Sequence, residues 1–377
     1  MVEQSKKPIK SILCVHQGYE LYGSDRSFAL SVGILKTLYP TVKVSVVIPK
    51  EGPIRQLLEP VSDELIIDEN LGVLRRKELK KAPFRLLYKI IRGALSAVVS
   101  SKKYDLVYIN TIVVVDYILA ARFMKASAVL HIREIPTGLQ QVFFNKLVSF
   151  SKLNIIFNSS STSQAFRLPI KQNKAVLLNG VKGFPDVAKI AHSGVNILLI
   201  GRLTEWKGQM FFLKALSQLL KHKNYDIKVR IVGDVFENQI EYKEALQGYV
   251  QTHDLEEKVT FSPFTDNPES EYEWSDIVVI PSTKPEPFGR VAIEAMSARR
   301  CVIAANHGGL TEIVEDKQSG VLFDANNIDS FIFEIQQLLD TPILIGEYAE
   351  RGLQVFKNKF SEETYKENFS KLMLDVE

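Results

Sequence analysis

Short apolar runs alternate with longer amphipathic stretches along this chain of 377 residues, and this alternation restricts its fold more than any other feature. Apolar runs that predict buried strands occur at 11–16, 44–48, 65–67, 105–109, 128–132, 154–157 and 175–178, and again at 196–200, 228–232, 259–261, 277–280, 301–304 and 320–323. The pattern is typical of α/β proteins with doubly wound parallel sheets covered by helices. Because 377 residues are too many for one ordinary core, we expect two such domains.

The composition indicates a soluble globular protein, with 46% hydrophobic and 24% charged residues. The two cysteines, Cys14 and Cys301, lie in apolar runs far apart in the sequence. We therefore expect buried free thiols and a reducing, cytoplasmic location. The first ten residues carry no apolar segment, so no signal peptide is predicted. The most apolar stretch, 106–123, is interrupted by Asn110 and Asp116 and makes a poor membrane span.

Charge is divided unequally between the two halves of the chain. Residues 1–185 contain 27 lysines and arginines and 13 acidic residues, whereas residues 186–377 contain 20 and 31. A basic half predicts an anionic partner. Nucleic acid is disfavoured because no nucleic-acid-binding motif is present. An anionic membrane surface fits better, which predicts a peripheral location on the inner face of the cell membrane.

The basic residues concentrate in 75–103, where ten lysines and arginines stand against Glu78 alone. Apolar residues recur there at helical spacing: Phe84, Leu87, Tyr88, Ile91, Leu95 and Val98. Such a helix can lie on an anionic bilayer or pack its apolar face on the protein's own sheet. We expect the apolar stripe to belong to the core and the excess charge to attract the membrane. We expect the apolar segment 139–150 to be buried in the core as well, with a groove for a lipid-linked acceptor as the alternative.

The segment 277–299 predicts a strand, a turn and a helix, with Glu286 in the turn and Glu294 in the helix. A helix that starts after Gly289 directs unpaired N–H groups forward, an arrangement that favours phosphate. Gly289 also lets a ligand approach the backbone, and Glu294 could bind a sugar diol. These features suit a nucleotide sugar. The alternative is an exposed helix with a capping Glu and a solvated one.

A second loop, 201–208, follows the predicted strand 196–200 and contains Arg202 and Lys207. At the carboxyl end of a strand, these two cations could bracket a diphosphate. Solvated surface cations are the alternative.

These two motifs resemble those of the family 4 retaining glycosyltransferases, which have the GT-B fold. Glu286 to Glu294 is similar to their Glu-x7-Glu signature, 201–208 to their Gly-Arg-x4-Lys-Gly loop, and 308–314 to their Gly-Gly-x-x-Glu segment. The resemblance implies two Rossmann-like domains facing across a cleft. It implies an acceptor-binding domain at 1–183, a nucleotide-sugar donor-binding domain at 184–360, and a helix at 361–377 that crosses back to the first domain.

The resemblance also implies roles for individual residues. Catalytic roles fall on Glu286, His131, Arg202 and Lys207, and donor binding on Arg202, Lys207, Glu286, Phe288, Gly289, Arg290, Glu294 and Phe264. The cations and the helix start stabilise the departing nucleoside diphosphate, Glu294 holds the ribose and Glu286 the donor sugar. Phe264 lies in a turn that packs on the nucleobase. His131 reaches the donor sugar, although a lone His at a strand end is often structural.

In the first domain, Gly23 and Ser24 lie in a loop that resembles the family's cleft loop, with an ordinary strand–helix turn as the alternative. Ser24 is also a predicted helix N-cap. Because no Asp-x-Asp motif is present, we expect no metal and no cofactor. The predicted enzyme is a retaining hexosyl- or deoxyhexosyltransferase that uses a glycan or lipid-linked acceptor in surface polysaccharide synthesis. The alternatives are a nucleotide-sugar epimerase or a phosphorylase on the same fold, or an inactive partner subunit.

Overall fold

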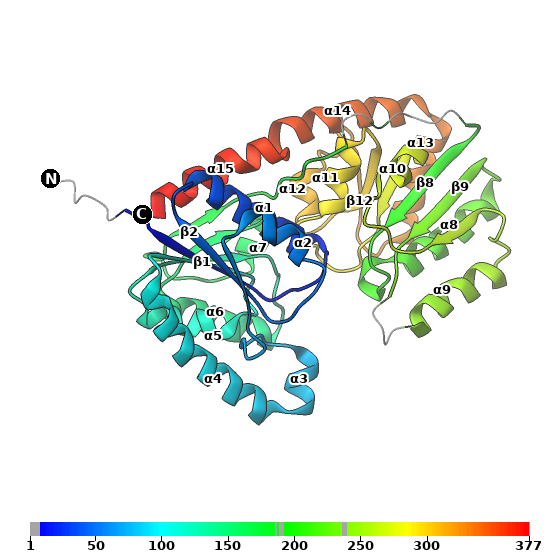
Figure 1. Ribbon diagram of the computed structural model, residues 1–377. Coiled ribbons are helices and arrows are strands. Elements are labelled where there is room, and N and C mark those ends of the chain that lie inside the picture. The colour runs from blue at the N-terminus through cyan, green and yellow to red at the C-terminus, as the bar shows by residue number, and fades with distance from the viewer. Residues whose placement is uncertain (1–7, 185–186, 188–191, 236–239, 377) are drawn as a thin grey trace. The chain divides into compact units, whose positions relative to one another are not determined.

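The computed structural model describes residues 8–184, 187, 192–235 and 240–376 (Figure 1). The chain divides into two compact units, one of Met1–Gly180 with Glu363–Glu377 and one of Val181–Glu362. The predicted divisions, after residues 183 and 360, lie close to these bounds. The linker predicted over 182–193 lies partly outside the described residues.

The first unit contains a parallel seven-stranded sheet of order β3-β2-β1-β4-β5-β6-β7. Its strands are β1 (Ser11–His16), β2 (Lys43–Ile48), β3 (Glu64–Ile67), β4 (Leu106–Asn110), β5 (Ser127–Ile132), β6 (Asn154–Phe157) and β7 (Lys174–Val176). Its helices are α1 (Gly23–Leu38), α2 (Arg55–Leu58), α3 (Arg76–Lys81), α4 (Pro83–Ser100), α5 (Val115–Ala120), α6 (Leu139–Ser151), α7 (Ser160–Gln164) and α15 (Glu362–Val376), with short 3-10 turns η1 (Glu59–Val61), η2 (Ser101–Lys103) and η3 (Ala121–Phe123).

Helices cover both faces of this sheet, as a doubly wound fold requires. On one face α4, α5 and α6 pack on the strands (Figure 1). On the other face lie α1 and the C-terminal α15, whose Tyr365, Phe369 and Met373 are buried in the core of the first unit. Ser31 and Tyr365 share a buried hydrogen bond of 2.8 Å. The last helix therefore belongs to the same core as strand β1 and helix α1.

The second unit repeats the architecture with a parallel six-stranded sheet of order β10-β9-β8-β11-β12-β13. Its strands are β8 (Val195–Ile200), β9 (Ile227–Val232), β10 (Val259–Ser262), β11 (Ile277–Ile280), β12 (Cys301–Ala305) and β13 (Val321–Phe323). Its helices are α8 (Gln209–His222), α9 (Ile240–Thr252), α10 (Glu269–Trp274), α11 (Arg290–Ser297), α12 (Leu310–Ile313), α13 (Ile328–Asp340) and α14 (Ile343–Lys359), with the 3-10 turn η4 (Glu205–Lys207). The predicted doubly wound α/β class is confirmed.

Cys14 in β1 and Cys301 in β12 lie in strands that are paired on both sides, where both are free and buried, as predicted. Burial raises the pKa of the Cys301 thiol to about 12, because the thiolate would lose its hydration. Within the described part of the chain, no helix has the length and apolar character needed to span a bilayer.

Three local predictions were wrong. Tyr22, not Ser24, is the N-cap of α1, because the Asp25 carboxylate accepts the Tyr22 N–H at 2.9 Å and places Ser24 inside the helix. The sequence of 112–123 predicts a helix over that whole segment, but the helix begins at Val115, because Val114 first forms a bridge with Val73. The basic segment 75–103 contains two helices instead of one, since Pro83 disfavours a helical backbone at Ala82.

The expected burial of the apolar stripe in this segment was also wrong. Phe84, Leu87, Tyr88, Ile91 and Leu95 are exposed, and α4 instead packs on the sheet through Leu86, Ile90 and Ala97.

Candidate functional site

The order of strands in the second unit determines where its loops can bind a ligand. The chain adds β9 and β10 on one side of β8 and then returns to add β11 on the other. Ligands of open α/β sheets bind at such a reversal, beyond the carboxyl ends of the strands. The loops at this point are 201–208, after β8, and 281–289, after β11. They contain most of the predicted donor-binding residues.

Backbone contacts hold these two loops against each other. The Thr283 N–H donates to the Trp206 carbonyl at 2.8 Å. Gly208 has a φ of 79°, and a Cβ added to it would lie 1.8 Å from the carbonyl oxygen of Pro281. Only glycine fits this position, because the backbone conformation and the missing side chain are both needed.

Replacing Gly208 by alanine is therefore expected to destabilise the second unit by roughly 2 kcal/mol or more, through strain and a backbone clash. Both tryptophans, Trp206 and Trp274, lie in this unit, so fluorescence-detected urea unfolding reports on it. Gly248→Ala is the matched control. Gly248 lies in α9 with no atom within 4 Å of an added Cβ, and alanine there should stabilise the helix by about 1 kcal/mol. Equal effects of the two substitutions would contradict this account of the loops.

Glu286 and Lys207 form a salt bridge between the two loops. The Lys207 Nζ lies 2.7 Å from the Glu286 Oε1, and the Ser282 hydroxyl donates to the same oxygen at 2.6 Å. Glu286 is only 5% exposed, whereas the Lys207 side chain is 22% exposed. The Lys207 ammonium also lies 4.5 Å from the centre of the Trp206 ring. The pair therefore fixes a cation and a carboxylate side by side, with the cation nearer to solvent.

The turn that carries Glu286 is itself held by the loop after β12. The Gly309 N–H donates to the Glu286 carbonyl at 2.7 Å. A Cβ on Gly308 would lie 2.4 Å from the same carbonyl oxygen, so glycine is required for this approach. His307 contacts the Ser282 carbonyl through its Nε2 at 2.8 Å. The segment 307–309 thus supports the site through the backbone of its two glycines and the side chain of His307.

Glu294 is held at a second position in the same unit, on α11. The Arg290 Nε donates to its Oε1 at 2.6 Å, and the Tyr272 hydroxyl donates to its Oε2 at 3.1 Å. Burial and the Glu294 charge raise the pKa of Tyr272 well above its usual range, so Tyr272 stays a hydrogen-bond donor. Gly289, with a φ of 117°, is the N-cap of this helix. Glu286 and Glu294 thus have separate partners, and Tyr272 is a supporting residue that the sequence analysis missed.

The remaining predicted donor-binding residues occupy different environments. Arg202 is half-buried directly after β8, and its carbonyl accepts from Gln209 at 3.0 Å. Phe264 is 49% exposed beyond β10, and its N–H donates to Asp234 at 3.3 Å. Phe288 is buried with its ring 6.0 Å from that of Phe360, so the side chain belongs to the core and only its backbone can meet a ligand.

In the first unit, His131 is fully buried near the end of β5. Its Nδ1 lies 2.8 Å from the Tyr108 hydroxyl and 3.2 Å from an Arg133 Nη2. Burial, and secondarily the Arg133 charge, lower the pKa of His131 well below its usual value, so the ring is neutral. This setting is that of a structural histidine, and its contact with a donor sugar stays a prediction.

His131 adjoins a buried polar network that the sequence analysis missed. The His16 Nε2 lies 2.7 Å from Asp25, and its Nδ1 lies 2.9 Å from the Asn110 amide. Arg133 donates to Asn110 at 2.7 Å and to Asn179 at 2.5 Å. His16, Asn110 and Arg133 end or follow β1, β4 and β5, so the network lines the carboxyl edge of the sheet, where ligands bind. Their positions at strand ends were the only sequence signal.

The predicted loop residues Gly23 and Ser24 are the first two residues of α1, and Gly23 is exposed. Neighbouring Asp25 packs beneath the loop, where a Cβ on Gly18 would lie 1.9 Å from its Oδ1. The loop after β1 therefore covers the His16–Asp25 pair. Its role at a cleft stays a prediction.

The neutral state of His131 predicts a pH dependence of stability. A histidine whose pKa is lowered by folding stabilises the fold above its unfolded pKa of 6.5, and this stabilisation is lost as pH falls. Relative to His131→Asn, which cannot titrate, the wild type should lose stability as pH falls below 6.5, by up to about 1.4 kcal/mol per pH unit. Urea unfolding followed by far-UV circular dichroism measures this loss.

Tryptophan fluorescence, which follows the second unit only, is the internal control for this comparison. A constant difference in unfolding free energy between wild type and variant across this pH range would show that His131 titrates normally in the folded chain.

Comparison with known proteins agrees with this geometry. Residues 184–354 match the family model described as glycosyl transferases group 1. Over 145 residues the chain is 32% identical to the uncharacterised glycosyltransferase MJ1607 of Methanocaldococcus jannaschii, covering 38% of this chain and 35% of the relative. Over 175 residues it is 31% identical to the D-inositol 3-phosphate glycosyltransferase of Paenarthrobacter aurescens, covering 46% and 40%. The matches thus span about two fifths of the length of these curated relatives.

Solved structures resemble the chain over nearly its whole length. Anabaena HepE in complex with UDP and glucose superimposes with a TM-score of 0.78 at 22% identity, covering 96% of this chain and 98% of that one. The sucrose-phosphate synthase of Thermosynechococcus elongatus does so with a TM-score of 0.77 at 18% identity, covering 97% and 99%. The likeness confirms the predicted GT-B fold.

Proposed function

We propose that this chain, whose residues 184–354 match the glycosyl transferases group 1 model and which has the GT-B fold, transfers a sugar from a nucleotide-sugar donor to a glycan or lipid-linked acceptor, with retention at the anomeric carbon. The observation that carries the proposal is the Lys207–Glu286 pair at the strand-order reversal of the second unit. This pair holds a cation that can bind the diphosphate next to a carboxylate that can bind the sugar.

In the proposed reaction, the bond between the anomeric carbon and the donor diphosphate breaks, and a bond to the acceptor oxygen forms on the same face of the sugar. Lys207, Arg202 and the N–H groups at the start of α11 stabilise the charge that develops on the leaving diphosphate. Glu286 orients the donor sugar by accepting hydrogen bonds from the hydroxyls of the sugar. The acceptor proton passes to an oxygen of the departing diphosphate. Glu294 binds the ribose diol.

Lys207 can serve this role because its salt bridge is only partly buried. An incoming diphosphate brings at least two negative charges to a lysine that otherwise has one carboxylate partner of opposite charge, Glu286. The ammonium has three donors and can bind phosphate while it keeps Glu286. Glu286 would then be positioned by the same lysine that binds the leaving group.

The finer features of the proposal are a hexose or deoxyhexose donor, surface polysaccharide synthesis, and a cytoplasmic enzyme that works at the membrane surface. They rest on the resemblance to the family and on the basic first unit.

Because two cationic side chains can neutralise the diphosphate, we also propose that transfer needs no metal. Turnover should be unchanged within about twofold after EDTA treatment, and its loss, restored by Mg²⁺ or Mn²⁺, would contradict this point.

Calorimetric binding of UDP, GDP, ADP and dTDP tests the proposal, followed by mass-spectrometric detection of transfer from the matching nucleotide sugar. UDP is the first to try, since HepE was solved with UDP and glucose. Selective binding of one nucleotide is expected. Binding of none would argue for an inactive partner subunit. Conversion of the nucleotide sugar without acceptor would indicate an epimerase, and absorbance of a lysine-bound pyridoxal phosphate would indicate a phosphorylase.

A further inference from the structure

Helix α4 has three distinct faces, and one of them is apolar and exposed. Leu86, Ile90 and Ala97 face the sheet and are buried. On the outer side, six large apolar side chains are between 53% and 86% exposed: Phe84, Leu87, Tyr88, Ile91, Leu95 and Val99. They recur at the three- and four-residue spacing that places side chains on one face of a helix. We call them the α4 stripe.

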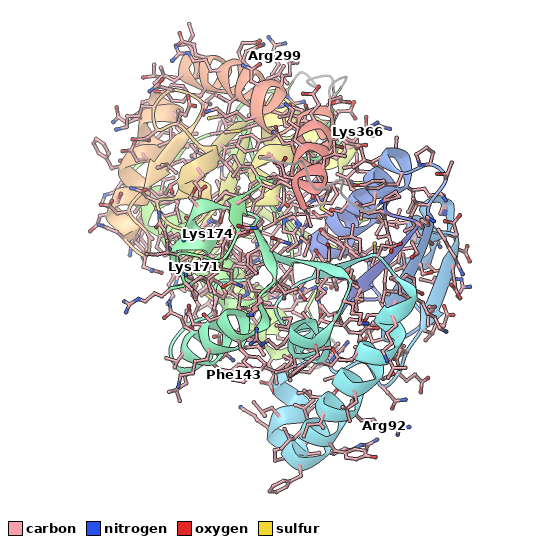
Figure 2. All side chains as sticks on the ribbon, turned by 90° about the vertical axis from the view of Figure 1, so that its left-hand side faces the viewer. Arg92, Phe143, Lys171, Lys174, Arg299 and Lys366 are labelled. Atoms are coloured by element: carbon pink, nitrogen blue, oxygen red, sulfur yellow. The ribbon has the colours of Figure 1, made fainter. Side chains whose placement is uncertain are left out.

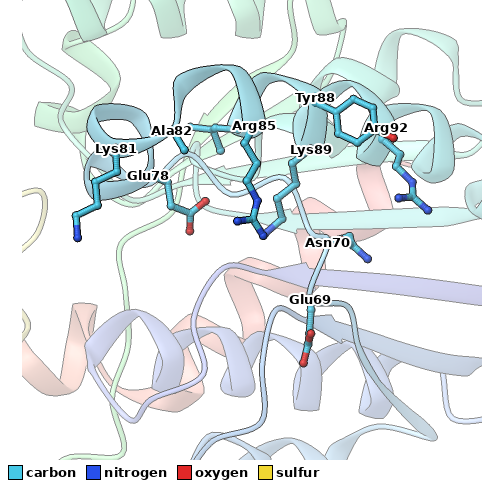
Figure 3. A pocket seen from close by; sticks show the side chains of 10 residues that line it. Glu69, Asn70, Glu78, Lys81, Ala82, Arg85, Tyr88, Lys89 and Arg92 are labelled. Atoms are coloured by element: carbon cyan, nitrogen blue, oxygen red, sulfur yellow. The ribbon is translucent and has the colours of Figure 1, made fainter.

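The third face of α4 is basic and adjoins the stripe. Arg85, Lys89 and Arg92 project to one side of the helix, toward the loop of Glu69 and Asn70 (Figure 3). Together with Lys81 from α3, they line a cavity of about 450 Å³. Figure 2 shows Arg92 at the outer side of this helix. A row of cations thus borders an exposed apolar surface along about two turns of the helix.

Helix α6 has a second group of exposed apolar residues: Leu139, Val142, Phe143 and Phe150, joined by Phe123 of η3. The Phe123 and Phe150 rings lie 6.4 Å apart, and the Arg122 guanidinium lies 5.7 Å from the Phe150 ring. Helices α4, α5 and α6 pack side by side on the same face of the sheet (Figure 1). Apolar residues beside cations therefore occur at both edges of one helical layer.

We propose that the first unit docks on an anionic membrane surface through the α4 stripe, with Arg85, Lys89 and Arg92 contacting lipid phosphates. Apolar side chains of an interfacial helix insert into the boundary between headgroups and acyl chains, and neighbouring cations bind the anionic headgroups. The buried face of α4 anchors the helix to the sheet, so the stripe can insert without unfolding. The inference deepens the proposed function, on which it rests for the membrane location of the acceptor.

Charge favours a membrane over a second copy of the chain as the occupant. An isologous dimer through α4 would bring two basic rows together, and like charges at an interface are repulsive. A bilayer that contains phosphatidylglycerol instead offers negative charge beside an apolar interior. The α4 stripe matches the apolar interior of the bilayer, and the basic row matches its negatively charged headgroups.

Co-sedimentation with vesicles of phosphatidylcholine and phosphatidylglycerol in about equal parts tests the docking surface. The wild type should bind them, and binding should weaken as salt is raised or phosphatidylglycerol is left out. Phe84→Ser/Ile91→Ser/Leu95→Ser should weaken binding roughly tenfold or more. The matched control is Ile240→Ser/Phe333→Ser/Ile343→Ser, which removes three side chains of the second unit that are 55% to 70% exposed, and should bind like the wild type.

A second pair of variants tests the basic row. Arg85→Glu/Lys89→Glu/Arg92→Glu should also weaken binding roughly tenfold or more. Lys214→Glu/Lys221→Glu/Lys228→Glu makes the same change in net charge on exposed lysines of the second unit and should have a much smaller effect. Equal losses for the two charge variants would show that only net charge matters and would overturn the assignment to α4.

Two further results would overturn the docking proposal. One is unchanged vesicle binding by the α4 stripe variant. The other is self-association of the lipid-free wild type, measured by analytical ultracentrifugation, that the stripe variant abolishes, because the face would then join two copies. Calorimetric nucleotide binding by the same variants separates this inference from the proposed function. A variant that loses vesicle binding but still binds the nucleotide would show that the substitutions affect the docking surface and not the donor site. A wild type that binds no nucleotide would contradict the proposed function, whatever its vesicle binding.

Discussion

Glu286→Gln should lower kcat/KM for transfer by roughly a thousandfold while the affinity for the free nucleoside diphosphate changes only a few-fold. The carboxylate accepts hydrogen bonds from Lys207 at 2.7 Å and from Ser282 at 2.6 Å. Glutamine keeps the size of the side chain but removes its charge and can turn an NH₂ group toward one of these donors. The sugar then loses its orienting group, and Lys207 loses its paired anion. Steady-state transfer kinetics and calorimetry of the matching diphosphate measure the two effects.

Glu205→Gln is the matched control for this substitution. Glu205 is exposed and lies two residues before Lys207 on the same loop, so it tests the effect of removing one negative charge close to the site. Transfer should stay within about twofold of the wild type, because an exposed carboxylate interacts weakly through water. If Glu286→Gln transferred sugar at the wild-type rate, Glu286 would be a structural partner of Lys207 and nothing more.

The strands of this fold could be predicted from sequence almost residue by residue. Parallel strands that are buried on both faces are continuous apolar runs, so Ser11–His16 and Ile277–Ile280 begin and end as expected. The loops after β8 and β11 could be located for the same reason, because they follow well-defined strands. Glycines at 201, 208 and 289, all with positive φ, mark where the backbone turns.

The orientation of α4 could not be predicted, and the reason is physical. Both the Leu86–Ile90–Ala97 face and the α4 stripe are apolar at helical spacing, and periodicity does not say which of two apolar faces meets the sheet. The residues of the buried polar network in the first unit could not be predicted from the sequence either. Asp25, His16, Asn110, Arg133 and Asn179 come from separate segments and meet only when the first sheet has formed.

Glu294→Ala should weaken binding of the preferred nucleoside diphosphate by at least a hundredfold, because two charge-assisted hydrogen bonds to the ribose would be lost. The orientation of this carboxylate is already fixed, because Arg290 donates to one of its oxygens at 2.6 Å and Tyr272 donates to the other at 3.1 Å. A carboxylate so fixed loses little rotamer freedom when the ribose binds, which raises its contribution to affinity. Calorimetric titration of wild type and variant measures the change.

Tyr272→Phe provides the graded control for this site. It removes one hydrogen bond from Glu294 and leaves the carboxylate and its bond to Arg290 in place. Affinity should therefore fall only a few-fold, because the side chain is less firmly oriented but its charge and its acceptor oxygens remain. The order wild type, Tyr272→Phe, Glu294→Ala in decreasing affinity is the expected result. Equal affinity of wild type and Glu294→Ala would place the nucleotide elsewhere on the chain and would leave Glu294 as a partner of Arg290 within α11.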